Sequence, residues 1–179
     1  MSENIVVLSG SPREGGNTDR LVAAFIAGAE TAGKTVTLFR VADMSISGCL
    51  GCQHCFGSNG VCVQKDDMSM ILSAMKKADT LVFASPVYYF SLTAQLKLAI
   101  DRTYALIKNK PPIKKAALLL TCGDSTAAAA KGSVATYQGI CAHSKWEDAG
   151  VITAPGLHAP DEIEGRDELE KARELGLLI

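Results

Sequence analysis

The chain has 179 residues, with 18 lysines and arginines against 19 aspartates and glutamates and a formal net charge of −1. This length predicts one domain, residues 1–179, with a core large enough to fold alone. The balanced charge excludes a general affinity for nucleic acid or for an anionic membrane. The apolar stretches are too short to span a bilayer and Met1–Asn4 lacks the basic start of a signal peptide, so we expect a soluble cytoplasmic protein.

Short apolar segments alternate with segments of helical periodicity along the chain. Residues 5–8 form an apolar run closed by Ser-Gly-Ser-Pro, which is typical of a strand buried on both faces. Further strands are expected at 35–41, 80–84, 116–121 and 151–154. Helices are expected from residue 17 or 18 to 33, at 68–75 behind a capping Asp66, at 92–107, from about 134 to near 150, and at 166–177.

Five strands separated by helices predict a doubly wound α/β fold. Each parallel return needs a right-handed crossover, so the sheet should be parallel with helices on both faces. In the flavodoxin-like strand order 2-1-3-4-5, ligands bind outside the carboxyl ends of the first and third strands, where the order reverses. The loops that leave these two strands are therefore the first place to look for a site.

The loop after the first strand, residues 9–18, is rich in glycine and hydroxyl groups and runs directly into a predicted helix. Its backbone N–H groups and the positive end of that helix would bind a phosphate. Arg13 can balance the phosphate charge, and Asn17 either caps the helix or binds a phosphate oxygen. A capped turn without a ligand uses the same residue types. The candidate ligands are Ser9, Ser11, Arg13, Gly16, Asn17 and Thr18.

The loop after the third strand carries aromatic rings. The backbone of Val87 and Tyr88 would meet the polar edge of a flat ring system, with an aromatic side chain packed nearby. The sequence does not decide which ring stacks, and Phe90 is expected in the core or at a subunit interface. The candidate residues of this loop are Ser85, Pro86, Val87, Tyr88 and Tyr89.

A third loop follows the fourth strand and would close the site from the other side. It contributes Gly123 and Asp124, whereas Cys122 is expected to be buried because no histidine near it in sequence could activate it as a nucleophile. A ligand with a phosphate at one end and a flat aromatic system at the other would satisfy these loops together. Flavin mononucleotide (FMN) has this form.

Residues 28–35 match the phosphate-binding pattern G-x-x-x-x-G-K-[ST]. A loop of that kind must leave a strand and open a helix, so that the helix N-terminus faces the anion. This segment instead closes a predicted helix and opens a strand. We therefore interpret Gly33 as a helix C-terminal residue.

Four cysteines follow the pattern C-x2-C-x2-C-x6-C in an insertion loop at about residues 44–66. Closely spaced thiolates can converge on one centre, and an iron-sulfur cluster fits the compact spacing best. Zinc also accepts four thiolates, and a metal-free loop of reduced thiols is the remaining alternative. His54 lies inside the motif and is expected to be solvated. The candidate metal ligands are Cys49, Cys52, Cys55 and Cys62.

Four segments resemble one known family: residues 10–18, 84–88 and 96–102, and the cysteine run followed by residues 65–68. That family is the NADPH-dependent FMN reductase superfamily, and the segments most closely resemble its iron-sulfur flavoprotein branch. The resemblance covers residues 4–102 well. It implies a flavodoxin-like fold, FMN held by the loops at 9–18 and 85–89, NAD(P)H as co-substrate and a 4Fe-4S cluster on the four cysteines. It also implies a homodimer or homotetramer.

The expected function is that of an FMN-dependent oxidoreductase, which moves electrons between NAD(P)H or a reduced carrier and a small acceptor such as a quinone or an oxygen species. No catalytic side chain is required, because the flavin carries the chemistry. One alternative is an electron-transfer flavoprotein without its own substrate, partnered with ferredoxin-like proteins. Another is a nucleotide-binding module stabilised by zinc.

Overall fold

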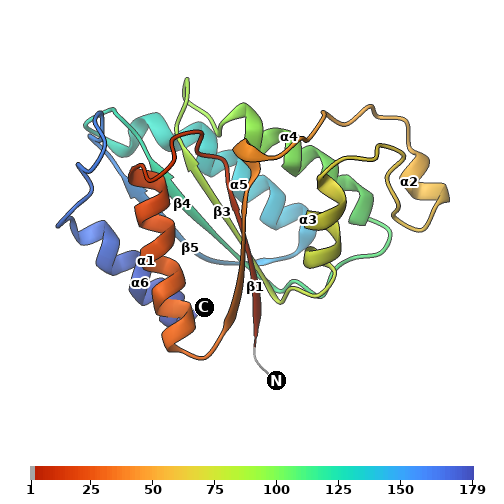
Figure 1. Ribbon diagram of the computed structural model, residues 1–179, viewed down its shortest axis with the longest axis horizontal. Helices are drawn as coiled ribbons and strands as arrows, with labels where there is room; N and C mark the ends of the chain where they lie inside the picture. The colour runs from red at the N-terminus through yellow and green to blue at the C-terminus, as the bar shows by residue number, and fades with distance from the viewer. Residues whose placement is uncertain (1–2) are drawn as a thin grey trace.

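Five parallel strands form the centre of the molecule in the computed structural model, which describes residues 3–179 (Figure 1). The sheet order is β2-β1-β3-β4-β5, and every neighbouring pair is parallel. The predicted flavodoxin-like topology is therefore confirmed. The strands are β1 (Asn4–Ser9), β2 (Thr35–Arg40), β3 (Thr80–Pro86), β4 (Lys115–Thr121) and β5 (Glu147–Ala154).

Helices cover both faces of the sheet (Figure 1). On one face, α1 (Asn17–Thr31) packs along α6 (Asp167–Leu178); the other carries α3 (Met68–Met75), α4 (Ala94–Arg102) and α5 (Lys131–Ser144). Among residues 3–179, no helix is long and apolar enough to cross a membrane. The shorter helices are η1 (Val41–Asp43), α2 (His54–Gly57), η2 (Thr103–Leu106) and η3 (Ala127–Ala130).

Alternate residues of the central strands enter two separate apolar layers. In β1, Val6 and Leu8 pack with α3 and α4, whereas Ile5 and Val7 pack with α1 and α6. Because both faces are covered, β1 reads as a continuous apolar run, which is why it was predictable. The cysteine segment and α2 project from one end of this body, beyond α3 (Figure 1).

The phosphate-loop-like segment at 28–35 has a structural role. Gly28 lies in α1 where α6 crosses it, and a Cβ atom there would come within 2.0 Å of the Arg173 carbonyl oxygen. Gly33 follows the end of α1 with a φ of +77°, a conformation that glycine adopts at helix C-termini. The segment therefore closes a helix and opens β2, as predicted.

Two helix boundaries differ from the sequence prediction. The helix expected at 92–107 is α4, which ends at Arg102 and continues as the 3-10 helix η2. The helix expected to end near Gly150 stops at Ser144, because Lys145 adopts a left-handed φ of 60°. Glu147–Gly150 instead begin β5, which is longer than the predicted 151–154. This half of β5 is polar because it lies at the sheet edge.

Tyr137 fixes the irregular start of β5. Its hydroxyl lies 2.8 Å from the carbonyl oxygen of Ala116 and 2.7 Å from Oδ1 of Asp148. Ala116 pairs with Asp148 and Ala117 with Gly150, so one residue of β5 bulges out of the ladder. Burial, followed by the contact with Asp148, raises the pKa of the Tyr137 hydroxyl above its ordinary value. The hydroxyl thus stays protonated and joins α5 to the β4–β5 edge.

We predict that Tyr137→Phe lowers the free energy of unfolding by about 1–3 kcal/mol at neutral pH, because the buried carbonyl oxygen of Ala116 loses its donor. Since the pKa is raised on folding, this stabilisation is complete below the unfolded value of about 10 and is lost as the pH rises above it. Denaturant titrations at several pH values should show the gap between the two proteins closing in alkali. Tyr89→Phe, at a side chain that is 97% exposed, is the control and should change nothing.

Candidate functional site

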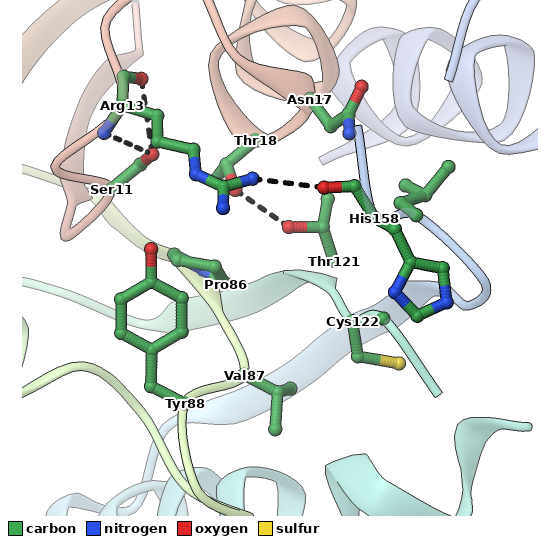
Figure 2. A pocket seen from close by; sticks show the side chains of 12 residues that line it. Ser11, Arg13, Asn17, Thr18, Pro86, Val87, Tyr88, Thr121, Cys122 and His158 are labelled. Atoms are coloured by element: carbon green, nitrogen blue, oxygen red, sulfur yellow. Dashed lines mark hydrogen bonds between the residues drawn. The ribbon is translucent and has the colours of Figure 1, made fainter. Parts of the chain in front are cut away.

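The loops after β1, β3, β4 and β5 meet around a cavity of about 190 Å³ at the carboxyl end of the sheet (Figure 2). Eight of the thirteen predicted cofactor-binding residues line it, and they come from three separate loops. They are Ser11, Arg13, Asn17, Thr18, Pro86, Val87, Tyr88 and Gly123. The residues predicted from the sequence therefore meet at one cavity, but they do not include every residue that lines it.

The N-terminus of α1 opens towards the cavity. Its N-cap residue is Gly16, which has no side-chain oxygen with which to bond the free N–H groups of the first turn. Asn17 does not cap the helix, and that part of the prediction is wrong. Its Nδ2 donates to the carbonyl oxygen of Ala159 at 2.8 Å, and its Oδ1 accepts from the N–H group of Ile163 at 3.3 Å. The helix mouth thus keeps backbone donors and a positive dipole end for an anion.

Side chains of the first loop are held by short polar contacts. The Oγ of Ser11 accepts from the N–H group of Arg13 at 3.3 Å, which closes a tight turn. The Arg13 Nη1 donates to the carbonyl oxygen of His158 at 3.3 Å across the cavity (Figure 2). The hydroxyls of Thr18 and Thr121 lie 2.7 Å apart and tie α1 to the end of β4. A guanidinium and the hydroxyl residues Ser11, Thr18 and Thr121 therefore line the same space as the helix mouth.

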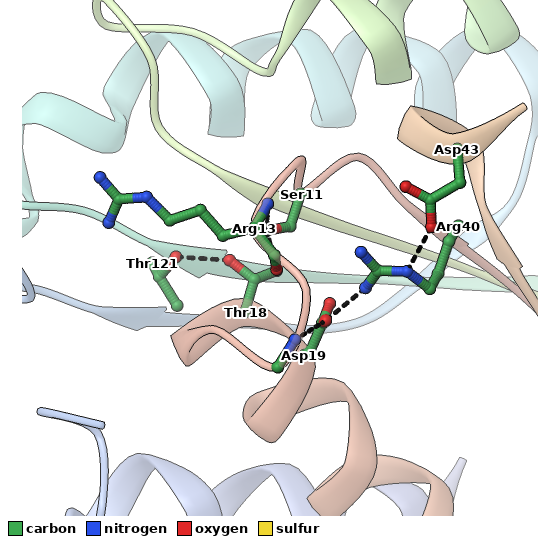
Figure 3. A network of polar contacts seen from close by, with 8 residues as sticks. Ser11, Arg13, Thr18, Asp19, Arg40, Asp43 and Thr121 are labelled. Atoms are coloured by element: carbon green, nitrogen blue, oxygen red, sulfur yellow. Dashed lines mark hydrogen bonds and ion pairs between the residues drawn. The ribbon is translucent and has the colours of Figure 1, made fainter. Parts of the chain in front are cut away.

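An acidic residue in the first turn of α1 supports this loop from outside the cavity (Figure 3). The Oδ2 of Asp19 accepts from the N–H group of Gly15 at 2.9 Å and from Arg40, whose Nε donates to Asp43 at 2.7 Å. Burial lowers the pKa of Arg40, but hydrogen bonds and charge from Asp43 and Asp19 outweigh it and raise the pKa overall. Arg40 therefore balances the Asp19 carboxylate beside a loop that is suited to an anion.

Five predicted cofactor residues do not line the cavity: Ser9, Gly16, Ser85, Tyr89 and Asp124. The fully buried Ser85 hydroxyl donates to Pro86 and accepts from the N–H group of Thr93, which is a loop-building role. The Asp124 carboxylate accepts from the backbone and the hydroxyl of Thr126, and these hydrogen bonds hold its pKa below the ordinary value. Tyr89 is 97% exposed at the tip of its turn.

Phe90 was expected in the core or at a subunit interface. It is 65% exposed, so the core position is wrong. Tyr89 and Phe90 both have positive φ values, 47° and 67°, which turn the backbone sharply and project their rings outward. Their rings contact each other, with centroids 5.9 Å apart. The loop after β3 therefore presents exposed aromatic surface beside the cavity.

Four cavity residues were not among the predicted ligands: Thr121, Cys122, Leu157 and His158. The last two follow β5, and applying the carboxyl-end rule to every strand would have included that loop. Cys122 is buried, as expected, and burial followed by the Asp124 charge raises its thiol pKa. A raised pKa disfavours the thiolate and so disfavours a nucleophilic role.

The four cysteines of the insertion loop line a second, smaller cavity of about 30 Å³, together with Arg102 and Tyr104. Cys49 and Cys52 are exposed, Cys55 and Cys62 are half-buried, and all four are free thiols. Over residues 3–179, no three cysteine, histidine or acidic side chains are gathered closely enough to hold a single metal ion. The structure thus brings the thiols to one cavity without closing them on a single point.

A buried ion pair forms the base of the cysteine loop. The guanidinium of Arg102 binds both carboxylate oxygens of Asp66, at 2.7 and 2.9 Å. Asp66 was predicted to cap α3, but the N-cap residue is Asp67; the Oδ1 of Asp66 nevertheless accepts from the N–H group of Met68 at 3.2 Å. The hydrogen bonds from Arg102 hold the pKa of Asp66 below its ordinary value, despite partial burial. Hence the carboxylate stays charged at neutral pH.

Comparisons with known proteins match most of the chain to one family. The family model described as NADPH-dependent FMN reductase matches residues 4–144. An iron-sulfur flavoprotein of Archaeoglobus fulgidus is 38% identical over 97 residues, which cover 54% of this chain and 44% of the relative. Iron-sulfur flavoprotein MJ1083 of Methanocaldococcus jannaschii is 37% identical over 102 residues, covering 57% and 52%. The chain therefore spans about half the length of these curated relatives.

Solved structures share the fold. The NAD(P)H:quinone oxidoreductase from Methanothermobacter marburgensis superposes with a TM-score of 0.76 at 16% identity, covering 99% of this chain and 96% of that one. The chain belongs to the NADPH-dependent FMN reductase family. The resemblance identified from the sequence is thereby confirmed, including the similarity to iron-sulfur flavoproteins.

We predict that Gly10→Ala destabilises the site. A Cβ atom at Gly10 would lie 2.4 Å from Oγ1 of Thr93 and 2.6 Å from Cβ of Leu96, so the loop or α4 must move. We expect a loss of about 1–3 kcal/mol in the free energy of unfolding, measured by denaturant titration. Gly139→Ala in α5 meets no atom within 4 Å and is the control, with an expected gain of up to about 1 kcal/mol. Equal stability of the two variants would contradict the close approach.

Proposed function

We propose that the protein is an FMN-dependent oxidoreductase that binds FMN in the cavity at the carboxyl ends of β1 and β3. The observation that carries the proposal is the N-terminus of α1, which has glycine at its N-cap and opens into this cavity. Membership of the FMN reductase family supports the same ligand. The remaining walls of the cavity suit the other parts of FMN.

The phosphate would lie at the mouth of α1. First-turn N–H groups and the helix dipole favour an anion there. Ser11 and Thr18 supply hydroxyl donors, and Arg13 supplies a positive charge that no carboxylate inside the cavity neutralises. The Asp19 carboxylate nearby is already bonded to Gly15 and Arg40. The donor set thus fits a phosphate without a metal ion.

The flat ring would lie beside the loop after β3. Pro86, Val87 and Tyr88 form that wall of the cavity, and Tyr88 is 43% exposed. A volume of about 190 Å³ is below the roughly 300 Å³ of typical whole-ligand pockets. We therefore place the phosphate and the chain that follows it inside, and the ring at the open edge where a second substrate can reach it.

Bound FMN supplies hydride and single-electron transfer, and the protein supplies placement and electrostatics. The family supports NAD(P)H as the electron donor. For the acceptor we propose a small molecule such as a quinone or an oxygen species. Nothing in the cavity demands a side-chain acid or base, and the buried Cys122 is poorly suited to be one.

A second candidate function is electron transfer between proteins, with FMN reduced by a ferredoxin-like partner. The cysteine loop favours this candidate, because four thiols line one cavity and relatives of the chain are named iron-sulfur flavoproteins. We propose that Cys49, Cys52, Cys55 and Cys62 hold a 4Fe-4S cluster. Each thiolate of such a cluster binds a different iron atom, which agrees with thiols that surround a space rather than a point. A bound cluster would supply one-electron transfer.

We further propose that the chain assembles as a homodimer or homotetramer. The support is the exposed aromatic pair Tyr89 and Phe90 at the edge of the cavity, since large exposed apolar side chains beside a site favour subunit contacts. Light scattering on the purified protein should give a mass of two or four chains.

If the phosphate lies beside Arg13, Arg13→Gln should weaken the binding of FMN but not that of riboflavin. Loss of one charge-assisted contact costs about 1.5–3 kcal/mol, so the Kd for FMN should rise about 10- to 100-fold. The Kd for riboflavin, which lacks the phosphate, should stay within about twofold of the wild-type value. Flavin fluorescence quenching measures both constants.

Arg20→Gln is the matched control, because Arg20 lies on α1, the helix that follows the Arg13 loop, but pairs with Asp161 and Glu164 at the surface. It should leave both flavin affinities unchanged. If Arg13→Gln weakened riboflavin and FMN equally, the phosphate would not lie beside Arg13.

The function itself is tested by purification without oxygen, followed by an absorption spectrum, iron and sulfide analysis, and assays with NAD(P)H. Flavin absorbance with rapid NAD(P)H-dependent reduction of a quinone or dye supports the oxidoreductase. Flavin and cluster without such turnover, but with rapid reduction by a ferredoxin, supports the carrier. Absence of flavin after reconstitution with FMN excludes both, and zinc in place of iron would favour a nucleotide-binding module.

A further inference from the structure

A buried arginine lies against the cysteine cavity, far along α4 from the phosphate loop. Arg102 is 2% exposed, and its side chain lines the cavity together with the four cysteines. Its Nη1 donates to the carbonyl oxygen of Ser47 at 2.7 Å as well as to Asp66. Asp66 also accepts from the N–H group of Ser47 at 3.1 Å. Arg102, Asp66 and Ser47 thus form one closed set of contacts.

This set ties together the two ends of the cysteine loop. Ser47 lies two residues before Cys49, and Asp66 lies four residues after Cys62, so every cysteine of the motif falls between them. A single guanidinium on α4 therefore fixes both ends of the segment to a helix of the core. A buried ion pair contributes little net stability compared with apolar packing, so stability alone gives no reason for a charge here.

The orientation of the guanidinium leaves one nitrogen without a partner. Both Nη atoms face Asp66, so Nε is at the end away from the carboxylate. Within residues 3–179, the buried Nε has no hydrogen-bond acceptor. The Cys62 side chain lines the same cavity as this guanidinium. A buried N–H group without an acceptor is unfavourable, and a thiolate sulfur would remove that penalty.

We propose that Arg102 is a positioning residue of the cysteine site: it fixes both ends of the loop and donates its Nε–H group to the Cys62 sulfur when the thiolates hold a cluster. The inference rests on the cluster proposed above. A hydrogen bond and a positive charge beside a ligand sulfur stabilise the more negative, reduced state of a cluster. Arg102 therefore raises the reduction potential of the cluster.

The test uses the full chain, purified without oxygen and reconstituted with FMN, iron and sulfide. Arg102→Gln removes the charge, and Arg102→Lys keeps the charge but loses the forked geometry. The double variant Asp66→Asn/Arg102→Gln removes both charges together, so no unpaired charge is left buried. Lys97→Gln is the control, because Lys97 is an exposed cation of α4 that pairs with Asp101.

Three measurements are made on each protein: iron and sulfide per chain, FMN per chain with the circular dichroism spectrum, and the cluster potential from a redox titration followed by electron paramagnetic resonance. The FMN content and dichroism report folding independently of the cluster. In Arg102→Gln, we expect the ratio of reduced to oxidised cluster at a fixed potential to fall about tenfold, a shift of about 59 mV to lower potential. In the double variant, which loses the Nε–H donor but keeps the net charge, we expect a smaller fall of about threefold. Arg102→Lys keeps the charge but lacks the Nε–H donor, so its ratio should also fall about threefold, and it should bind less than half the iron.

The outcomes separate this inference from the proposed function. Wild-type protein that binds FMN but no iron and sulfide would overturn the cluster and, with it, the role of Arg102. Wild-type and Arg102→Gln proteins with equal cluster content and equal potential would overturn the role of Arg102 alone. If Arg102→Gln does not fold, the double variant decides, and an unchanged potential in it overturns the inference. A shift in Lys97→Gln as large as in Arg102→Gln would also overturn it.

Discussion

The parallel pairing of β1 with β3 is the constraint on which the cavity depends. Ser9 at the end of β1 lies opposite Ala84 of β3, and the N–H group of Gly10 donates to the Ala84 carbonyl oxygen at 2.8 Å. The Gly10 carbonyl oxygen in turn accepts from the Thr93 hydroxyl at 2.9 Å. Two of the four loops that form the cavity are thus fixed to each other before any ligand binds. A side chain at Gly10 would force them apart.

Helix α4 connects the two candidate sites. At its N-terminus, Thr93 bonds the first loop and Ser85; at its C-terminus, Arg102 bonds the ends of the cysteine loop. The helix has nine residues, which at 1.5 Å per residue gives a length of about 14 Å. A rigid element of this length holds the cysteine cavity at a fixed separation from the phosphate loop. Both centres of the proposed oxidoreductase would therefore be positioned by one helix.

The parts that the sequence predicted well are those determined by local pattern. Continuous apolar runs identified the central strands, and their alternation with helices predicted a parallel sheet. The strand order followed from the flavodoxin-like version of that fold. The polar start of β5 was missed because an edge strand needs no apolar face. The Asn17 cap was wrong because Ala159 and Ile163, far along the chain, take up its amide. Local pattern does not contain such contacts.

The same difference between local pattern and long-range contact applies to the two candidate sites. Residues of the first loop were identified because glycine, hydroxyls and arginine directly before a helix are typical of an anion-binding site. His158 was not predicted, because only the fold of the loop after β5 brings it to the cavity. Arg102 belonged to a stretch of sequence that carried the family resemblance, but an arginine on a helix is usually exposed, and its burial against the cysteines is visible only in three dimensions.

The most direct measurement is a crystal structure of the protein reconstituted with FMN. The account predicts the phosphate at the N-terminus of α1, bonded by the backbone N–H groups of residues 17 and 18 and facing Arg13, with the flavin ring against Val87 and Tyr88. A flavin seated with its phosphate away from α1, or a cavity that stays closed to FMN at saturating concentration, would contradict it.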